Sequence, residues 1–554
     1  MKIPPLNERF STFANYDVVD WLNSLVERRG DHPMIIWAPH EGSKETWTYR
    51  RFVHEVACVA GGLARRGVKK GDRVLVHLEN CPEMIISRFA CAWLGAVCVG
   101  TNALAAGPEI GYFADNSGAV GGITQPKFAE AVAANCKNLK WLAVTRSDAG
   151  VAPADFAVSR SESFAALMAE PLPRRAPDPY LAASIMFTTG TTSRPKGVVW
   201  THANVLWGGR VNSMQQGLRA DDVSMIFLPL YHVAGLSWNF FAQMWAGGTI
   251  VMQSKFSASR FWPLAQETRA TITSHVGFTL NAVSQGDIPP NNFRQWTMTR
   301  IEPEQIKKFG VDYLAGWGMT EVLTQAVVCD LNMTPPAKTM GRAGIGYQVR
   351  IVDETTGEDV EPGGAGHLLL GGIRGHSIFR EYDGNEQATD EAFDENGYFR
   401  TGDRVYLREN GWIEFSDRIK DVIKVGGEGV SAAEIEMVIA EVPGVEAVAV
   451  VAKPNPQYGE VAVACVIPKP DIAPESHPAI REAILALCRD QLAKFKVPRE
   501  VIFVSSFPRV GFGKISKAQI RDQILKGQIH EQACEQPQSQ ERSQEPSQER
   551  FKAS

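Results

Sequence analysis

The chain of 554 residues is longer than one hydrophobic core usually holds, so two or more domains are expected. Its 44% apolar and 21% charged residues are typical of a soluble globular protein. A net charge of −5 without a basic block argues against nucleic-acid binding, and no run of about 18 or more apolar residues indicates a membrane span.

The nine cysteines are scattered singly, with neither a Cys-x-x-Cys pair nor a Cys/His cluster of zinc-ligand spacing. Reduced thiols are therefore expected. The N-terminus lacks the basic-then-apolar pattern of a signal peptide. Together these features predict a cytoplasmic protein, and they leave its oligomeric state open.

Helical and strand-like stretches alternate over the first part of the chain, from Asp17 to about Ser147. The pattern predicts a helix from Trp47 to Arg66, a turn into a strand from Lys70 to His77, and a further helix from Pro82 to Leu94. Such alternation is typical of layered α/β structure. Residues 150–180 are rich in Ala, Pro and Arg, and a surface connection is expected there.

The apolar run Ala182–Phe187 predicts a buried strand, and a loop with five hydroxyl side chains follows it and closes on Lys196. Hydroxyl and backbone N–H donors in such a loop can surround a phosphate, while the lysine supplies positive charge. The loop is not a Walker A motif, because proline precedes the lysine and no G-x-x-x-x-G-K-[ST] match exists. A polar surface loop is the alternative.

A second α/β block is expected from Tyr231 to Glu321, and short alternating segments from Gly346 to Gly371 indicate β-hairpins. Near Arg418 the pattern changes to that of a compact α+β unit, large enough to fold as its own domain. Its predicted elements are a helix at 432–439, strands at 445–452 and 461–467, and a helix at 478–492.

The last segment is rich in Gln, Glu and Ser and repeats a four-residue pattern from Ser539 to Arg550. It has almost no apolar content, so disorder is predicted. The expected organisation is α/β, with a large N-terminal domain over residues 1–418 built from layered α/β subdomains and a β-hairpin region. A small mobile α+β domain over residues 419–525 and a disordered tail over residues 526–554 follow.

Five motifs in this order resemble those of the adenylate-forming (AMP-dependent ligase) superfamily, which includes acyl-CoA synthetases, amino-acid adenylation domains and beetle luciferases. The motifs are residues 187–197, Trp317-Gly-Met-Thr-Glu321, residues 397–403, residues 417–424 and residues 511–515. The resemblance runs from about residue 15 to about residue 523. The Thr-Thr-Ser-Arg-Pro-Lys-Gly version of the loop is similar to that of crotonobetaine/carnitine–CoA ligases, whereas many other relatives carry Gly where Ser193 stands.

The resemblance implies that ATP and Mg²⁺ are cofactors. When a carboxylate attacks the α-phosphate, negative charge crowds the site and must be offset. The residues implied to hold the β- and γ-phosphates are Thr188, Thr189, Gly190, Thr191, Thr192 and Lys196. Glu321 is implied as the Mg²⁺ ligand, since a carboxylate is a hard oxygen ligand, and Thr320 is implied to lie near the α-phosphate. Without the other motifs, Glu321 would be read as a surface residue.

The nucleoside contacts are implied in the same way. Trp317 replaces the tyrosine that stacks on adenine in the family; indole also stacks but lacks the phenol hydroxyl. Asp403 is the implied partner of the ribose hydroxyls, and Arg418 matches a second ribose or phosphate contact. Read alone, Thr-Gly-Asp403 would be a turn and Asp417-Arg418 a surface ion pair.

The C-terminal motifs imply a change of state between two half-reactions. Lys514 is implied to bridge the carboxylate and the α-phosphate in the first, as a compact charge on a flexible stem. Lys420 matches the pivot about which the C-terminal domain rotates before a thiol replaces AMP. That rotation brings in a glycine-bearing loop for the pantetheine chain of coenzyme A. The loop residues implied in this contact are Lys424, Gly426, Gly427 and Glu428.

One segment departs from the family. Trp296–Pro303 lacks the Gly-Gly-Ala-Pro-like turn that lines the adenine and acyl pockets of relatives, so those contacts cannot be carried over. The acyl pocket is expected between Tyr231–Phe241 and His275–Val283, which contain no Asp, Glu, Lys or Arg. His232 is a candidate catalytic residue there. An uncharged acyl group is therefore predicted, and the alternative is that the aromatic side chains are ordinary core.

The sequence thus predicts a ligase that converts a carboxylic acid, ATP and coenzyme A into an acyl-CoA through an acyl-adenylate. Two alternatives stay open: an adenylation enzyme that loads a carrier protein, and a catalytically inactive nucleotide-binding relative. The absence of an Asp in Leu228–His232 and of a carrier-domain serine motif favours a plain carboxylic acid as the partner. The joint presence of Lys196, Glu321, Asp403 and Lys514 favours an active enzyme.

Overall fold

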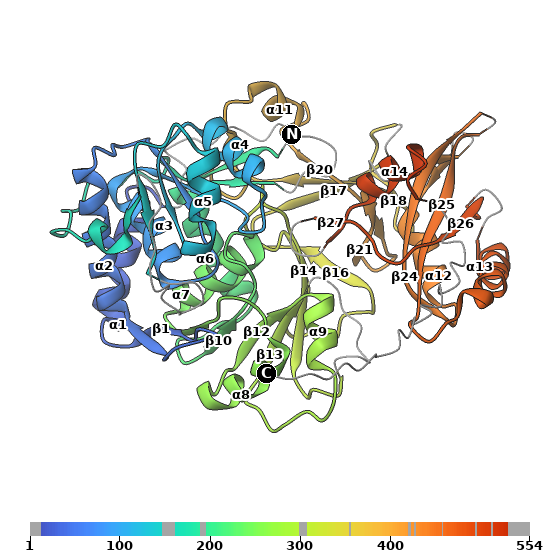
Figure 1. Ribbon diagram of the computed structural model, residues 1–554, viewed down its shortest axis with the longest axis horizontal. Coiled ribbons are helices and arrows are strands. Elements are labelled where there is room, and N and C mark those ends of the chain that lie inside the picture. Colours follow the sequence, from blue (N-terminus) through green and yellow to red (C-terminus); the bar gives the residue numbers. More distant parts are fainter. Residues whose placement is uncertain are drawn as a thin grey trace, which may run out of the picture. The chain divides into compact units, whose positions relative to one another are not determined.

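The computed structural model of the protein describes most of the chain, in two compact units (Figure 1). The described residues are 13–146, 161–188, 195–298, 307–353, 356–418, 423–425, 428–456, 458–492, 496–510 and 514–529. The first unit comprises the described residues up to Arg418 and Val510, and the second covers Ile423 to Arg509 and Lys514 to Ile529. The predicted boundary after residue 418 lies outside the described residues, as do residues 530–554 of the tail predicted from residue 526.

An eight-stranded, mostly parallel sheet forms one layer of the first unit, in the order β19-β9-β8-β4-β3-β5-β6-β7. Its strands are β3 (Arg73–His77), β4 (Val97–Gly100), β5 (Ala119–Thr124), β6 (Leu142–Val144), β7 (Ser161–Ser163), β8 (Ala182–Phe187), β9 (Gly197–Thr201) and β19 (Glu381–Tyr382). At one edge β19 pairs antiparallel with β9, and β9 pairs antiparallel with β8; the remaining neighbours are parallel. This edge carries the predicted phosphate loop between β8 and β9.

Helices cover both faces of this sheet. The α1 (Val18–Arg29), α2 (Tyr49–Arg65) and α3 (Pro82–Leu94) helices pack into the main core, which contains Val74 and Val76 of β3. The α4 (Gly107–Ser117) and α5 (Pro126–Asn135) helices pack on the opposite face, over Leu75. Successive side chains of β3 point to opposite faces of the sheet, so this one strand contributes to the core on each face. The helix predicted at Pro82–Leu94 and the strand predicted at Ala182–Phe187 have these bounds in the structure. The helix predicted from Trp47 to Arg66 instead begins at Tyr49, because the Thr48 hydroxyl caps it.

A thirteen-stranded sheet forms the second layer, in the order β17-β18-β20-β21-β16-β15-β14-β13-β12-β10-β11-β1-β2. Its strands are β1 (Pro33–Trp37), β2 (Glu45–Thr48), β10 (Val223–Ile226), β11 (Thr249–Met252), β12 (Ile272–His275), β13 (Gln295–Met298), β14 (Asp312–Trp317), β15 (Val327–Val328), β16 (Thr339–Ala343), β17 (Gln348–Val352), β18 (Ala365–Gly371), β20 (Phe399–Leu407) and β21 (Ile413–Arg418). The run from β14 to β1 is parallel, and the β17–β18 hairpin confirms the hairpin predicted from Gly346 to Gly371.

The helices of this layer include one unusual element. The regular helices are α6 (His202–Gln215), α7 (Ala242–Ala246), α8 (Ala258–Thr268) and α9 (Gly277–Val283), whereas α11 (Glu386–Glu391) packs against β19 of the eight-stranded sheet. Between β10 and α7, residues Ala234–Phe241 form a π-helix. Such widened helices are rare and occur frequently at functional sites. This one lies in the first of the two segments predicted to line the acyl pocket.

The second unit is the compact α+β fold that the sequence predicts. A five-stranded sheet contains β22 (Ile423–Val425), β23 (Glu428–Val430), β24 (Val445–Asn455), β25 (Gly459–Pro468) and β26 (Glu500–Phe503). The helices are α12 (Ala432–Ala440), α13 (His477–Gln491) and α14 (Lys517–Leu525), and a separate two-stranded sheet pairs β27 (Arg509–Val510) with β28 (Lys514–Ile515). Across both units, none of the described helices has the length and apolar character that crossing a membrane requires.

Candidate active site

Three residues of the predicted site and acyl segments lie at or after the carboxyl ends of parallel strands in the thirteen-stranded sheet. Trp317 ends β14, His275 ends β12, and His232 follows β10 in the same sheet. In open α/β sheets this edge is where ligands bind, because the loops that leave it diverge. The sequence predictions at these positions therefore fall where the fold can form a pocket.

Trp317 and Asp403 are joined directly. The indole Nε1 donates a hydrogen bond of 2.9 Å to Asp403 Oδ2, and both side chains are buried. Asp403 stands on β20 opposite Arg418 of β21, and its backbone N–H donates to the Thr401 hydroxyl at 3.0 Å. The preceding Gly402 has a φ of +73°, in the left-handed region that suits glycine. Trp317, the predicted adenine contact, thus orients Asp403, the predicted ribose contact.

The Thr320-Glu321 turn is fixed by its backbone. The Trp200 indole donates to the Thr320 carbonyl at 2.8 Å, and the Phe379 N–H donates to the Glu321 carbonyl at 2.7 Å. Directly afterwards Leu323 adopts a φ of +49°, which is unfavourable for a branched side chain. Such strain persists only where the surroundings enforce it, and it is concentrated at functional sites.

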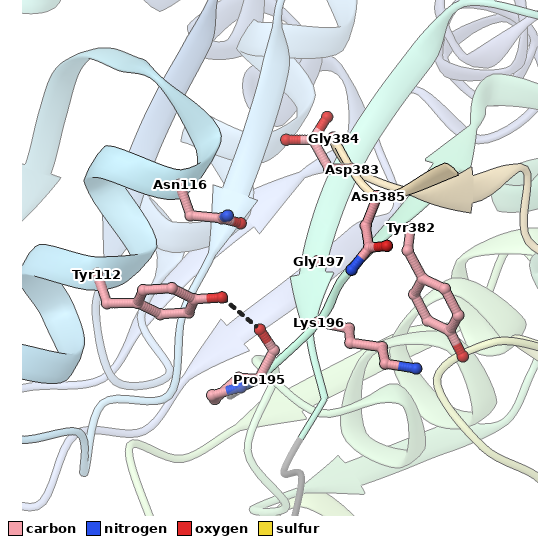
Figure 2. A pocket seen from close by; sticks show the side chains of 9 residues that line it. All are labelled: Tyr112, Asn116, Pro195, Lys196, Gly197, Tyr382, Asp383, Gly384 and Asn385. Carbon is pink, nitrogen blue, oxygen red and sulfur yellow. Dashed lines mark hydrogen bonds between the residues drawn. The ribbon is translucent and has the colours of Figure 1, made fainter. Parts of the chain in front are cut away.

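Tyr382 links two of the predicted residues, and the sequence analysis missed it. Its hydroxyl donates to Glu321 Oε1 at 2.9 Å, and Glu321 is only 5% exposed. The Lys196 ammonium lies 4.6 Å from the centroid of the Tyr382 ring, and Figure 2 shows the lysine side chain extending toward that ring. Burial first, and then the Glu321 carboxylate, raise the pKa of Tyr382 well above its ordinary value, so it stays protonated and donates.

The phosphate loop is closed at its neck. The Thr188 N–H donates to the Lys196 carbonyl at 3.0 Å, and the Lys196 N–H donates to the Thr188 hydroxyl at 3.2 Å. These bonds continue the antiparallel β8–β9 ladder by one more residue pair. The remaining predicted loop residues lie outside the described residues; they are Thr189, Gly190, Thr191 and Thr192.

A cavity of about 320 Å³ lies beside this neck. Figure 2 shows its lining residues, which are Tyr112, Asn116, Pro195, Lys196, Gly197, Tyr382, Asp383, Gly384 and Asn385. The Tyr112 hydroxyl donates to the Pro195 carbonyl at 3.0 Å, and Asp383 pairs with Arg73 at 3.4 Å. The stem of Lys196 therefore borders the cavity, while its charged end is directed toward Tyr382.

The π-helix brings the predicted acyl segment next to Trp317. A Cβ added to Gly318 would come within 2.8 Å of the Trp238 ring and 2.3 Å of the Thr324 carbonyl oxygen, so glycine is required at this close approach. Phe240 and Phe241 are instead fully buried in the main core, where Phe241 packs against Trp21. For these two rings the structure favours the core alternative over a pocket lining.

His232 is not hydrogen-bonded to any other predicted site residue that the structure describes. The residue is partly exposed, but its Nε2 atom is shielded from solvent and has no partner among the described residues. Burial lowers the pKa of His232 to about 4, so it is neutral near pH 7. A neutral imidazole can accept or donate a hydrogen bond but supplies no positive charge.

The predicted residues of the second unit lie on short strands. Lys514 opens β28, and Lys424 and Glu428 belong to the β22–β23 hairpin, in which Val425 pairs with Glu428. The hairpin thus keeps the two predicted coenzyme A contacts near one turn. Gly426, Gly427 and Lys420 lie outside the described residues.

Comparison with known proteins places this arrangement in a family. A family model described as AMP-binding enzyme matches residues 22–383, and one described as AMP-binding enzyme C-terminal domain matches residues 434–514. The chain belongs to the AMP-binding enzyme family. The resemblance to adenylate-forming ligases that the five motifs predict is thereby confirmed, and so is the α/β fold with a small second unit.

Relatives of this enzyme cover nearly all of it. A crotonobetaine/carnitine–CoA ligase of Salmonella paratyphi A is 30% identical over 516 residues, which are 90% of this chain and 98% of that protein. The structure of a Mycobacterium tuberculosis fatty acyl CoA synthetase is similar with a TM-score of 0.72 and 27% identity, over 92% of this chain and 99% of its own. An ATP-bound RpMatB-BxBclM chimera is similar with a TM-score of 0.81 and 25% identity, over 92% of this chain and 99% of the chimera chain.

Proposed function

We propose that this AMP-forming acid–CoA ligase activates a carboxylic acid without a free amino group or second carboxylate. In the first step a carboxylate oxygen bonds to the α-phosphorus of ATP, and the bond to the leaving pyrophosphate breaks. In the second step the coenzyme A sulfur bonds to the acyl carbon, the bond to AMP breaks, and the thiol proton is released. The observation that carries the assignment is the buried hydrogen bond between Trp317, four positions before Glu321, and Asp403, in a chain of this family.

The described residues fit a nucleotide with its metal. Trp317 offers an aromatic face for adenine and Asp403 offers a carboxylate for ribose hydroxyls. The described residues contain no group of three His, Cys, Asp or Glu arranged to hold a metal. A single carboxylate at Glu321 suits Mg²⁺, which is usually bound by one or two carboxylates together with substrate phosphates. When bound there, Mg²⁺ would offset phosphate charge.

The remaining residues divide between the two steps. Thr188, Lys196 and the loop between them would bind the β- and γ-phosphates, with Thr320 and Arg418 near the α-phosphate and ribose. Lys514 would serve only the first step, because a cation is needed where the carboxylate approaches the α-phosphate. Lys420 would be the pivot between the steps, and the β22–β23 hairpin would contact coenzyme A in the second.

The lining of the acyl segment supports the choice of acid. Neither Tyr231–Phe241 nor His275–Val283 contains a charged side chain, and Trp238 lies beside Gly318. An α-ammonium or second carboxylate would lose its hydration there without a partner, at a cost of at least several kcal/mol. A quaternary ammonium, as in the substrates named for the Salmonella relative, could instead be held by aromatic faces.

The free thiols of the described cysteines support a cytoplasmic location.

The experiment is a pyrophosphate-release assay over a panel of acids, with and without coenzyme A. We expect uncharged or quaternary-ammonium acids to exceed free amino acids and dicarboxylates by at least about tenfold in kcat/KM. Acyl-CoA should form only when coenzyme A is present. Preference for an α-amino acid, with no coenzyme A product, would refute the proposal and revive the carrier-loading alternative.

A further inference from the structure

Tyr382 occupies a place that its own backbone fixes. In the β19–β9 pairing it stands opposite Val198, two residues after Lys196. Its N–H donates to the Thr389 hydroxyl at 3.0 Å, and the next N–H, of Asp383, donates to the Gly197 carbonyl at 2.7 Å. The backbone at Tyr382 is thus fixed between Thr389 of α11 and the neck of the phosphate loop, and its ring lies beside Lys196.

The segment just before this strand is bonded to the Thr320-Glu321 turn. The Phe379 N–H donates to the Glu321 carbonyl at 2.7 Å, and the Phe379 ring packs 4.7 Å from the Tyr382 ring, centroid to centroid. One short segment therefore contacts the loop lysine and the acidic turn, which are 125 positions apart in the sequence. Tyr382 is the residue of this segment whose side chain contacts both functional groups.

We propose that Tyr382 is a positioning residue that aligns the Glu321 carboxylate and the Lys196 ammonium for a metal–triphosphate ligand. The hydroxyl orients the carboxylate by a charge-assisted hydrogen bond, and the ring face holds the ammonium. The ring carries no charge, so this contact leaves the Lys196 ammonium available for phosphate. Groups held in advance need little reorganisation when charge develops in the reaction.

This inference rests on the proposed function, because Glu321 and Lys196 are assigned to Mg²⁺ and phosphate only there. It predicts that the contact of the Tyr382 hydroxyl with Glu321 and the contact of its ring with Lys196 have different effects on ligand binding. Loss of the hydroxyl should act through Glu321 and appear only when Mg²⁺ is present. Loss of the ring should also release Lys196, whose attraction for phosphate does not require the metal.

The test uses the full chain with Tyr382→Phe, Tyr382→Leu and a matched control, Tyr49→Phe. Tyr49 is also buried, and its hydroxyl donates to the Gly248 carbonyl at 2.8 Å, away from the site. The measurements are the Kd of a non-hydrolysable ATP analogue by calorimetry, with Mg²⁺ and with EDTA, and the half-saturating Mg²⁺ concentration for pyrophosphate release. Melting temperatures report the general cost of losing a buried hydroxyl.

We expect Tyr382→Phe to raise the Kd with Mg²⁺ and the half-saturating Mg²⁺ concentration by about tenfold, as for loss of a hydrogen bond to a charged group. Its Kd in EDTA should stay within about twofold of wild type. Tyr382→Leu should weaken binding in both conditions, and Tyr49→Phe in neither. Equal losses with and without Mg²⁺ for Tyr382→Phe, or equal losses for Tyr49→Phe, would overturn the inference.

Measurements on Glu321→Gln distinguish a wrong positioning role for Tyr382 from a wrong metal assignment in the proposed function. If it shifts the Mg²⁺ dependence and Tyr382→Phe does not, the positioning role is wrong and the metal assignment stands. If Glu321→Gln leaves the Mg²⁺ dependence unchanged, the metal assignment is wrong, and the inference is overturned with it.

Discussion

The two units hold their predicted functional residues in different ways. In the first unit, Trp317, Glu321 and Asp403 lie in or beside strands of the large sheet, are buried, and are bonded to one another or to fixed side chains. In the second unit, Lys514 opens a two-residue strand outside the five-stranded sheet. We interpret the difference as a division of roles: the first unit holds a preformed nucleotide site, whereas Lys514, proposed to serve the first step only, is carried on a short strand outside the main sheet of its unit.

The strongest test of this division is Lys514→Ala. We expect adenylate formation to fall by at least about 2–4 kcal/mol in transition-state stabilisation, because a charge-assisted contact made in that step is lost. Thioester formation from supplied acyl-AMP should stay near normal. Pyrophosphate release and single-turnover thioester formation measure the two steps.

The matched control for this lysine is Lys517→Ala. Lys517 lies in the same unit, on α14, and pairs with Glu436 at 2.9 Å. It should leave both steps nearly unchanged. Near-normal pyrophosphate release by Lys514→Ala would remove Lys514 from the mechanism and with it the step-specific role of the second unit.

A proline at Lys420 should have the opposite effect. A ring that locks φ resists a hinge rotation, and a misplaced proline costs about 3 kcal/mol, equivalent to roughly a hundredfold in rate. Adenylation should persist while transfer to coenzyme A slows by about that factor. Lys420→Ala keeps φ free and should retain both steps. If Lys420→Pro slowed both half-reactions equally, the pivot assignment would be wrong.

The sequence predicted the fold and the family because their signals are local and ordered. The apolar run at Ala182–Phe187 and the helix at Pro82–Leu94 carry their own length and boundary residues, and the motifs occur in a fixed order. The acyl segment is different. Its apolar residues gave no sign of a π-helix, or of which rings face the core, because both depend on packing against distant strands.

The contacts within the site were also not predictable. Trp317 and Asp403 were each identified from a motif, but their hydrogen bond joins positions 86 residues apart. Tyr382 belongs to none of the five motifs, and a tyrosine before Asp-Gly-Asn is typical of a turn. Its importance comes from the β19–β9 pairing, which brings it opposite the loop neck. Such couplings between sequence-distant residues need the three-dimensional arrangement.

The Trp317–Asp403 bond gives a smaller, more specific prediction about the fixed unit. Trp317→Phe keeps an aromatic face but removes the N–H that orients the carboxylate. If Asp403 binds ribose hydroxyls, the preference for ATP over 2′- or 3′-deoxyATP should shrink by about five- to tenfold, as for a hydrogen bond to a charged group. Loss of stacking alone would weaken all three nucleotides equally.

Trp296→Phe is the control for this comparison. Trp296 is fully buried in the same unit, and its Nε1 has no hydrogen-bond partner among the described residues. The substitution should lower the melting temperature without changing the ratio between nucleotides. An unchanged ratio in Trp317→Phe as well would show that the indole N–H does not act through Asp403.

The smallest expected effect concerns the buried histidines of the first unit, of which His77 is typical. Its Nδ1 lies 2.9 Å from the Thr101 hydroxyl, and burial lowers its pKa to about 4. In the unfolded chain the pKa is about 6.5, so between these values the unfolded state binds more protons than the folded state. The stability that neutral His77 contributes is therefore fully present above about pH 6.5 and is lost as the pH falls toward 4.

From about pH 7.5 to 5.5 one such histidine should lower the free energy of unfolding by about 1 kcal/mol. Melting temperatures across this range measure the slope, and His77→Gln should make it shallower; an unchanged slope would show that His77 is already protonated in the folded protein.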